Sequence, residues 1–150
     1  MLDVDAFLSE EAKAWAEFKG RFDRLPSADF LTPGVVGDWT PKDLLVHVAS
    51  WHRWMSDKLT DYAGGFAKLE TLSAEAIDEL NTGFLERFVE WPVEGVIVLS
   101  RDAHTRAVVS IRASSFRGYD EEWERVIRSN TTEHYAEHLP HLDAFLKERG

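Results

Sequence analysis

Apolar residues recur at spacings of three and four along most of the chain, the pattern of amphipathic α-helices. The pattern predicts four long helices that begin near residues 4, 40, 93 and 119, and a shorter helix near residues 74–90. Pro33, Gly34 and Gly37 mark a loop of about a dozen residues between the first two helices, long enough to cross the end of a bundle. The sequence therefore predicts an all-α four-helix bundle with a long first crossover and one additional shorter helix.

The second helix has a well-defined start in the stretch DWTPKDLLVHVASW. Thr40 suits the N-cap, Pro41 suits the first helical position, and Asp43 lies where a capping box has its acidic partner. The inward-facing stripe of this helix contains His47 and Trp51. Gly64 and Gly65 are expected to end the helix.

The segment from Val93 to Ser115 allows two interpretations. Its β-branched runs VIVL and VVSI are typical of two strands of a hairpin. However, Val93, Ile97, His104 and Ile111 also share one helical stripe, and no Asn-Gly or Gly-Gly turn separates the two runs. We predict a helix for this segment.

The last helix is predicted to run from just after Gly118 to the end of the chain, with one inward stripe from Tyr119 to Phe145. Pro140 lies within it and removes one backbone donor, so a kink near Ala136 is expected.

Three of the six histidines fall in the stretch TTEHYAEHLPH of this helix. His134 and His138 are about 6 Å apart along one helix face, a spacing at which two imidazoles can bind one metal ion. His141 also faces inward but is about 10 Å from His134, so the possible ligand pairs are 134/138 and 138/141. His47 is a candidate third ligand. Paired helical histidines are nevertheless more often hydrogen-bonded surface residues than ligands.

The two other histidines are interpreted as structural. His52 points about 140° away from His47 on an ideal helix, so it is predicted to face outward. His104 is expected to lie in the core or at its boundary. The aromatic stripes are expected to be core.

Composition narrows the classes of partner. A formal net charge of −10 disfavours nucleic acid and anionic membranes as partners. The chain has no cysteine, so a metal would need His, Asp or Glu ligands. No apolar run approaches a membrane span and no signal peptide is visible, so a cytoplasmic protein is expected. The length fits a single domain over residues 1–150.

Three stretches resemble a known family. GDWTPKDLLVHVASWHRWM is similar to the start of the second helix in the DinB-like superfamily, and NTTEHYAEHLPHLDAFL is similar to the last helix of its ClbS/DfsB-type branch. IDELNTGFLERF is similar to a segment before the third long helix of that branch. The resemblance implies a bundle that is often a homodimer. In metal-binding members the ligands match His47, His134 and His138, so the resemblance selects the 134/138 pair.

The family resemblance implies several activities. Some members use a divalent ion, with Zn or Ni plausible here, to activate a low-molecular-weight thiol, and one ClbS/DfsB type hydrolyses a cyclopropane in a genotoxin. The first hypothesis is a metal-dependent enzyme, a thiol transferase or hydrolase acting on a reactive small-molecule electrophile in detoxification or resistance, with Trp51 and Tyr135 lining the pocket. The alternative is a metal-free resistance protein that sequesters a toxic metabolite. A third possibility is a dimeric bundle with a structural metal, closed by Glu133 or Glu137. The sequence assigns no catalytic residue.

Overall fold

The computed structural model describes residues 1–66 and 69–149, and every regular element among them is a helix. In chain order these are α1 (Val4–Asp23), the 3₁₀ helix η1 (Ser27–Leu31), α2 (Pro41–Ala63), α3 (Ala74–Arg87), α4 (Val93–Ser114), the 3₁₀ helix η2 (Ser115–Arg117), α5 (Glu121–Ser129) and α6 (Thr132–Arg149). The predicted all-α class is confirmed. No helix in the described part of the chain is long and apolar enough to cross a membrane.

The contacts of the chain group into two compact units. One unit comprises residues 1–44 and 118–150, and the other comprises residues 45–117. The expectation of a single domain over residues 1–150 stays a prediction, and the two units are described separately below.

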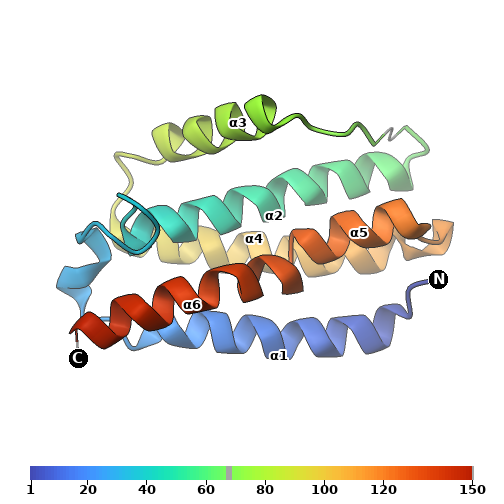
Figure 1. Ribbon diagram of the computed structural model, residues 1–150. Helices are drawn as coiled ribbons and strands as arrows, with labels where there is room; N and C mark the ends of the chain where they lie inside the picture. The colour runs from blue at the N-terminus through green and yellow to red at the C-terminus, as the bar shows by residue number, and fades with distance from the viewer. Residues whose placement is uncertain (67–68, 150) are drawn as a thin grey trace. The chain divides into compact units, whose positions relative to one another are not determined.

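In the first unit, α6 lies along α1 (Figure 1). The side chain of Asp3 caps α1 by accepting a hydrogen bond from the backbone N–H of Ala6 at 3.1 Å. The buried face of α1 includes Phe7, Phe18 and Phe22. These aromatic side chains bury a large apolar area, which makes this face a main source of stability for the unit.

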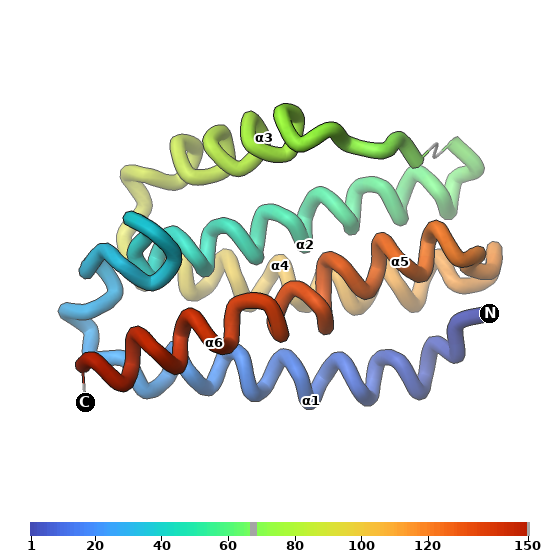
Figure 2. The backbone as a smooth tube through the Cα atoms, viewed as in Figure 1, coloured from blue at the N-terminus to red at the C-terminus, as the bar shows by residue number. Residues whose placement is uncertain are grey.

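The prediction of one continuous last helix is wrong, because the chain forms two helices, α5 and α6, that are separated at Asn130 and Thr131 (Figure 2). Asn130 Nδ2 donates to the carbonyl of Val126 at 2.8 Å, and Thr131 Oγ1 donates to that of Ile127 at 2.7 Å. Such local side-chain bonds compete with the helical ladder and favour a helix end. Helix α6 continues through Pro140, and the kink near Ala136 stays a prediction.

In the second unit, α2 and α4 are joined by a buried hydrogen bond in which Ser114 Oγ donates to the carbonyl of Leu59 at 2.9 Å. The buried face of α4 consists mainly of small or β-branched residues: Val96, Ser100, Ala103, Ala107, Ser110, Ile111 and Ser114. Val98 and Val109 lie on the exposed side. The predicted helix at Val93–Ser115 is confirmed, because the three-and-four spacing prevailed over β-branched propensity.

The predicted start and end of α2 are also confirmed. Thr40 Oγ1 accepts from the N–H of Asp43 at 3.1 Å, and Asp43 Oδ2 accepts from the N–H of Thr40 at 3.0 Å. This reciprocal pair is a capping box. At the other end the helix stops at Ala63, and Gly65 adopts a positive φ of 82° that glycine tolerates without strain.

Helix α3 confirms the additional shorter helix, although it ends at Arg87. Ser73 caps it by accepting from the N–H of Ala76 at 3.1 Å. None of its residues is fully buried. It contacts Trp51 of α2, whose Nε1–H donates to Asn81 Oδ1 at 2.8 Å and whose ring meets Phe84 edge-on at 5.4 Å.

Candidate metal centre

His134 and His138 lie one turn apart on α6, as their spacing predicts. Both side chains are buried, and their ring centroids are 4.9 Å apart. Burial disfavours the charged imidazolium and lowers the pKa of His138, which favours the neutral ring that a metal ion requires.

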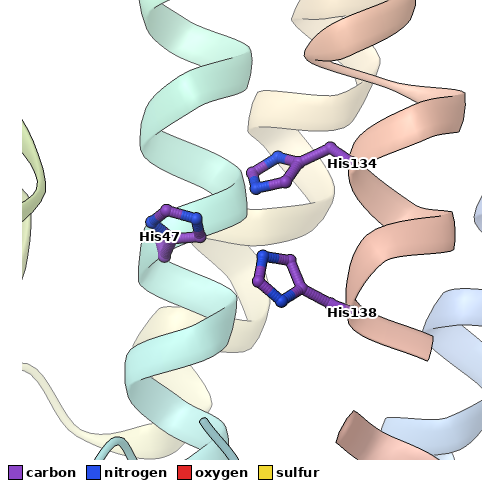
Figure 3. Close-up of side chains that lie close together, drawn as sticks. All are labelled: His47, His134 and His138. Carbon is purple, nitrogen blue, oxygen red and sulfur yellow. The ribbon is translucent and has the colours of Figure 1, made fainter. Parts of the chain in front are cut away.

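His47, on α2, is also buried and completes a group of three histidines that can hold a metal ion. Each residue offers one ring nitrogen, and the three nitrogens lie within 4.8 Å of one another (Figure 3). Nitrogens bound at ~2.1 Å to one tetrahedral ion are about 3.4 Å apart, so binding would require the separations between these nitrogens to shorten by at most about 1.4 Å. Of the two ligand pairs that sequence geometry leaves open, this group contains 134/138.

His138 has two polar neighbours on its own helix. Its Nδ1 is 3.2 Å from Nδ1 of His141, so one of the two rings donates to the other, and its Nε2 is 3.7 Å from Glu137 Oε2. Burial lowers the pKa of His138, Glu137 raises it, and His141 lowers it further. The prediction that His141 faces inward is wrong, because its side chain is exposed. His141 instead fits the role of a residue that orients a ligand through its second nitrogen.

His52 corrects another prediction. It was expected to face outward, but it is 0% exposed, and its ring lies 5.7 Å from that of His104. The reason is that every residue of α2 from 44 to 52 is buried, so this part of the helix has no outward face. Burial, followed by the proximity of His104, lowers the pKa of His52 to about 3. His104 is half-buried, which confirms the predicted boundary position.

The two predicted pocket residues have defined contacts. Trp51 is buried and packs against Trp54 at 5.4 Å in addition to its contacts with α3. Tyr135 is 0% exposed, and its hydroxyl donates to Glu11 Oε2 at 2.7 Å. Burial and the neighbouring Glu11 raise the pKa of Tyr135 well above its usual value, so the hydroxyl keeps its proton. That either residue lines a pocket stays a prediction.

Glu11 and Asn81, which bond to Tyr135 and Trp51, were not predicted from the sequence. Glu11 is 1% exposed, although glutamate is rarely buried without a partner. Its position on the helix was the available signal, because Glu11 is one turn after Phe7 and one turn before Trp15 on the apolar stripe. Asn81 lies in α3, which has no fully buried residue, so its position in the sequence did not indicate a buried contact.

Comparisons with known proteins agree with the fold and the motifs. A family model described as the mycothiol maleylpyruvate isomerase N-terminal domain matches residues 12–142. The solved structure of DfsB, described as a sibling lethal factor precursor, is similar with a TM-score of 0.80 at 13% sequence identity, over 99% of this chain and 98% of that chain. The likeness to DfsB shows a shared fold, and a search among curated proteins found no match. The resemblance to the DinB-like superfamily is thereby confirmed, assignment to its ClbS/DfsB-type branch stays a prediction, and the chain belongs to the mycothiol maleylpyruvate isomerase N-terminal domain family.

Proposed function

We propose that this protein binds a divalent metal ion, Zn or Ni, through His47, His134 and His138, and that it acts on a reactive small molecule. The observation that supports the proposal is the group of three buried histidines whose ring nitrogens lie within 4.8 Å of one another. Three neutral imidazoles suit both ions and leave a coordination position for a further ligand.

The surroundings of the histidines support metal binding. A metal ion binds only the neutral ring, so protons compete with it. The lowered pKa of His138 reduces this competition near neutral pH. The contact between His138 and His141 would orient the ring of His138 so that it presents its other nitrogen, Nε2, to the ion.

The proposed reaction is the transfer of a low-molecular-weight thiol to an electrophile, or the hydrolysis of that electrophile. The family model that the chain matches is named for a mycothiol-dependent isomerase, which supports a thiol such as mycothiol as co-substrate. A bound ion would lower the pKa of a thiol or a water molecule and hold it as a nucleophile. Trp51, one turn after His47 on α2, would supply an apolar wall for the electrophile. This chemistry fits detoxification or resistance.

Elemental analysis tests the metal directly. The protein is purified without a His-tag or a chelating column, and bound Zn or Ni is expected at about one ion per chain. The metal-free protein is then titrated with Zn²⁺ and with Ni²⁺ by calorimetry. If neither ion is retained or binds, the metal-dependent enzyme is excluded. The same histidines would then serve as hydrogen-bonding groups in a metal-free sequestering protein.

We also propose a homodimer, because the aromatic content is generous for one small core and because dimers are frequent in the family that the sequence resembles. The chain has a mass of 17.2 kDa, so a dimer has twice that mass. Light scattering at micromolar concentration is expected to give the dimer mass, and the monomer mass would contradict this part of the proposal.

A further inference from the structure

Glu11 is a buried carboxyl group on the apolar face of α1. It is 1% exposed and lies among Phe7, Leu8 and Phe18 on the buried side of the helix. Burying a carboxyl group costs several kcal/mol unless hydrogen bonds replace its lost hydration. An apolar residue of similar size would fill this position without that cost, so the carboxyl group itself needs an explanation.

Glu11 has a hydrogen-bond partner in Tyr135, which is 124 positions away in sequence. The Tyr135 hydroxyl donates to Glu11 Oε2 at 2.7 Å, and the bond is buried. The Tyr135 ring stacks on Phe18 at 5.4 Å and packs against Trp15 at 5.4 Å. Tyr135 is therefore fixed to α1 both by its ring and by its hydroxyl.

Tyr135 is adjacent to His134 and three residues before His138 on α6. At 100° per residue, the direction of Tyr135 determines the directions of both histidines, because all three side chains belong to one helix. A hydrogen bond needs a narrow range of distance and angle, so this bond opposes rotation and sliding of α6 against α1. Metal ligands must lie within about 0.2 Å of their required distances. A small rotation of α6 would therefore weaken metal binding.

We propose that Glu11 and Tyr135 are positioning residues that set the rotation of α6 and thereby place His134 and His138 for metal binding. The inference rests on the proposed function, which it deepens by assigning two residues that do not contact the ion.

A second link between the same two helices provides a matched control. Arg21 Nε donates to Asp143 Oδ1 at 2.9 Å, and the two side chains are 25% and 53% exposed. Exposed ion pairs of this kind are weak. Asp143 is about 12 Å along the helix from Tyr135. If any link between α1 and α6 were sufficient, Arg21→Gln would have the same effect as Tyr135→Phe.

The experiment separates positioning from stability. Zn²⁺ affinity and the thermal stability of the metal-free protein are measured for Tyr135→Phe, Glu11→Met, the double variant Glu11→Met/Tyr135→Phe, Glu11→Gln and Arg21→Gln. Each of the first two single variants breaks the hydrogen bond and keeps one of its two buried polar groups, whereas the double variant removes both groups and should regain most of the lost stability. Positioning predicts that Zn²⁺ affinity stays about 10- to 100-fold low in the double variant. Glu11→Gln keeps an acceptor for the hydroxyl and should bind Zn²⁺ nearly as wild type does, as should Arg21→Gln.

Recovery of affinity together with stability in the double variant would overturn the inference, as would unchanged affinity in all variants. A second measurement decides the case in which the wild-type protein binds no metal. Imidazole NMR signals of His134 and His138 in the metal-free double variant should shift, whereas those of His52 and His104 should not. If the wild type binds no metal but these signals do shift, the proposed function fails and the positioning of α6 stands. If the signals stay unchanged, the positioning fails as well.

Discussion

The molecule contains two histidine pairs that differ in one decisive respect. His134 and His138 lie on one helix with ring centroids 4.9 Å apart, and His52 and His104 lie on α2 and α4 at 5.7 Å. The first pair belongs to a group of three histidines whose nitrogens lie within 4.8 Å of one another. In the described residues, the second pair is part of no such group of three metal-ligating side chains. The number of converging ligands therefore separates a candidate metal centre from a structural pair.

Burial does not make this distinction. It lowers the pKa of His138 and lowers that of His52 even further, to about 3. His138 and His52 thus both meet the requirement for a neutral ring, although only His138 belongs to a group with a third imidazole nearby. A buried, neutral histidine is necessary for such a site but does not define one.

The largest expected effect is the loss of metal binding when a ligand is removed. His138→Ala should weaken Zn²⁺ binding by at least about 100-fold, because two imidazoles hold the ion far less tightly than three. His52→Ala should leave Zn²⁺ affinity unchanged, because His52 belongs to the structural pair. Calorimetric titration of the metal-free variants measures both. Equal loss in the two variants would show that the comparison is wrong and that affinity follows stability.

The burial of each helix explains how well the sequence predicted its histidines. His134 and His138 lie four residues apart, and His47 lies on an apolar stripe, so the sequence pattern made these three candidates, and the family resemblance selected the pair 134/138 over 138/141. The prediction for His52 assumed that α2 has one buried face, but every residue from 44 to 52 is buried. The apolar run LLVHVASW carried that signal, because a helix that is apolar on all sides is buried on all sides.

The fold was predictable to a similar degree. Capping residues and helical periodicity predicted α1 to α4 because these signals are local. The separation of α5 from α6 depends on Asn130 and Thr131, whose side chains bond to the preceding turn. Both residue types also occur inside helices, so the sequence alone did not show that the helix would end there. Glu11 was missed because its partner is 124 positions away.

A second expected effect is stabilisation by the metal. At a free Zn²⁺ concentration a hundredfold above the dissociation constant, the free energy of unfolding should rise by about 2.7 kcal/mol. Without metal, His52→Ala should be less stable than the wild type, but Zn²⁺ should stabilise it by the same amount. His138→Ala should lose this stabilisation by Zn²⁺. Thermal denaturation with and without Zn²⁺ measures the increment. The same melting temperature in both conditions for the wild type would contradict the three-histidine site.

A third expected effect belongs to the structural pair and concerns pH. The pKa of His52 is about 3 in the folded protein, below its usual value of 6.5, so the unfolded state binds a proton that the folded state does not. Stability from this group is complete above pH 6.5 and declines as pH falls from 6.5 towards 3. The loss between pH 7 and pH 5 is about 2 kcal/mol.

Urea denaturation at several pH values tests this decline. The difference between the wild type and His52→Asn isolates the contribution of His52, because the other titrating groups are common to both proteins. If His52→Asn does not fold, NMR of the wild type provides the test instead. The imidazole of His52 should remain neutral at pH 5, and a protonated ring there would contradict the prediction.

The smallest expected effect comes from His104, the half-buried partner of His52. Burial is the largest cause of the lowered pKa of His52, and the proximity of His104 is second. His104→Gln should therefore raise the pKa of His52 only slightly and leave it well below 5. While that pKa stays below 5, residue 52 takes up its proton between pH 7 and pH 5 almost only in the unfolded state. The stability that His104→Gln loses over this range should therefore differ from the wild-type loss by less than about 0.5 kcal/mol. Urea denaturation of the variant at both pH values measures this change. A clearly smaller loss of stability in His104→Gln would contradict this prediction. It would show that His104, more than burial, keeps His52 neutral and that the two histidines are electrostatically coupled.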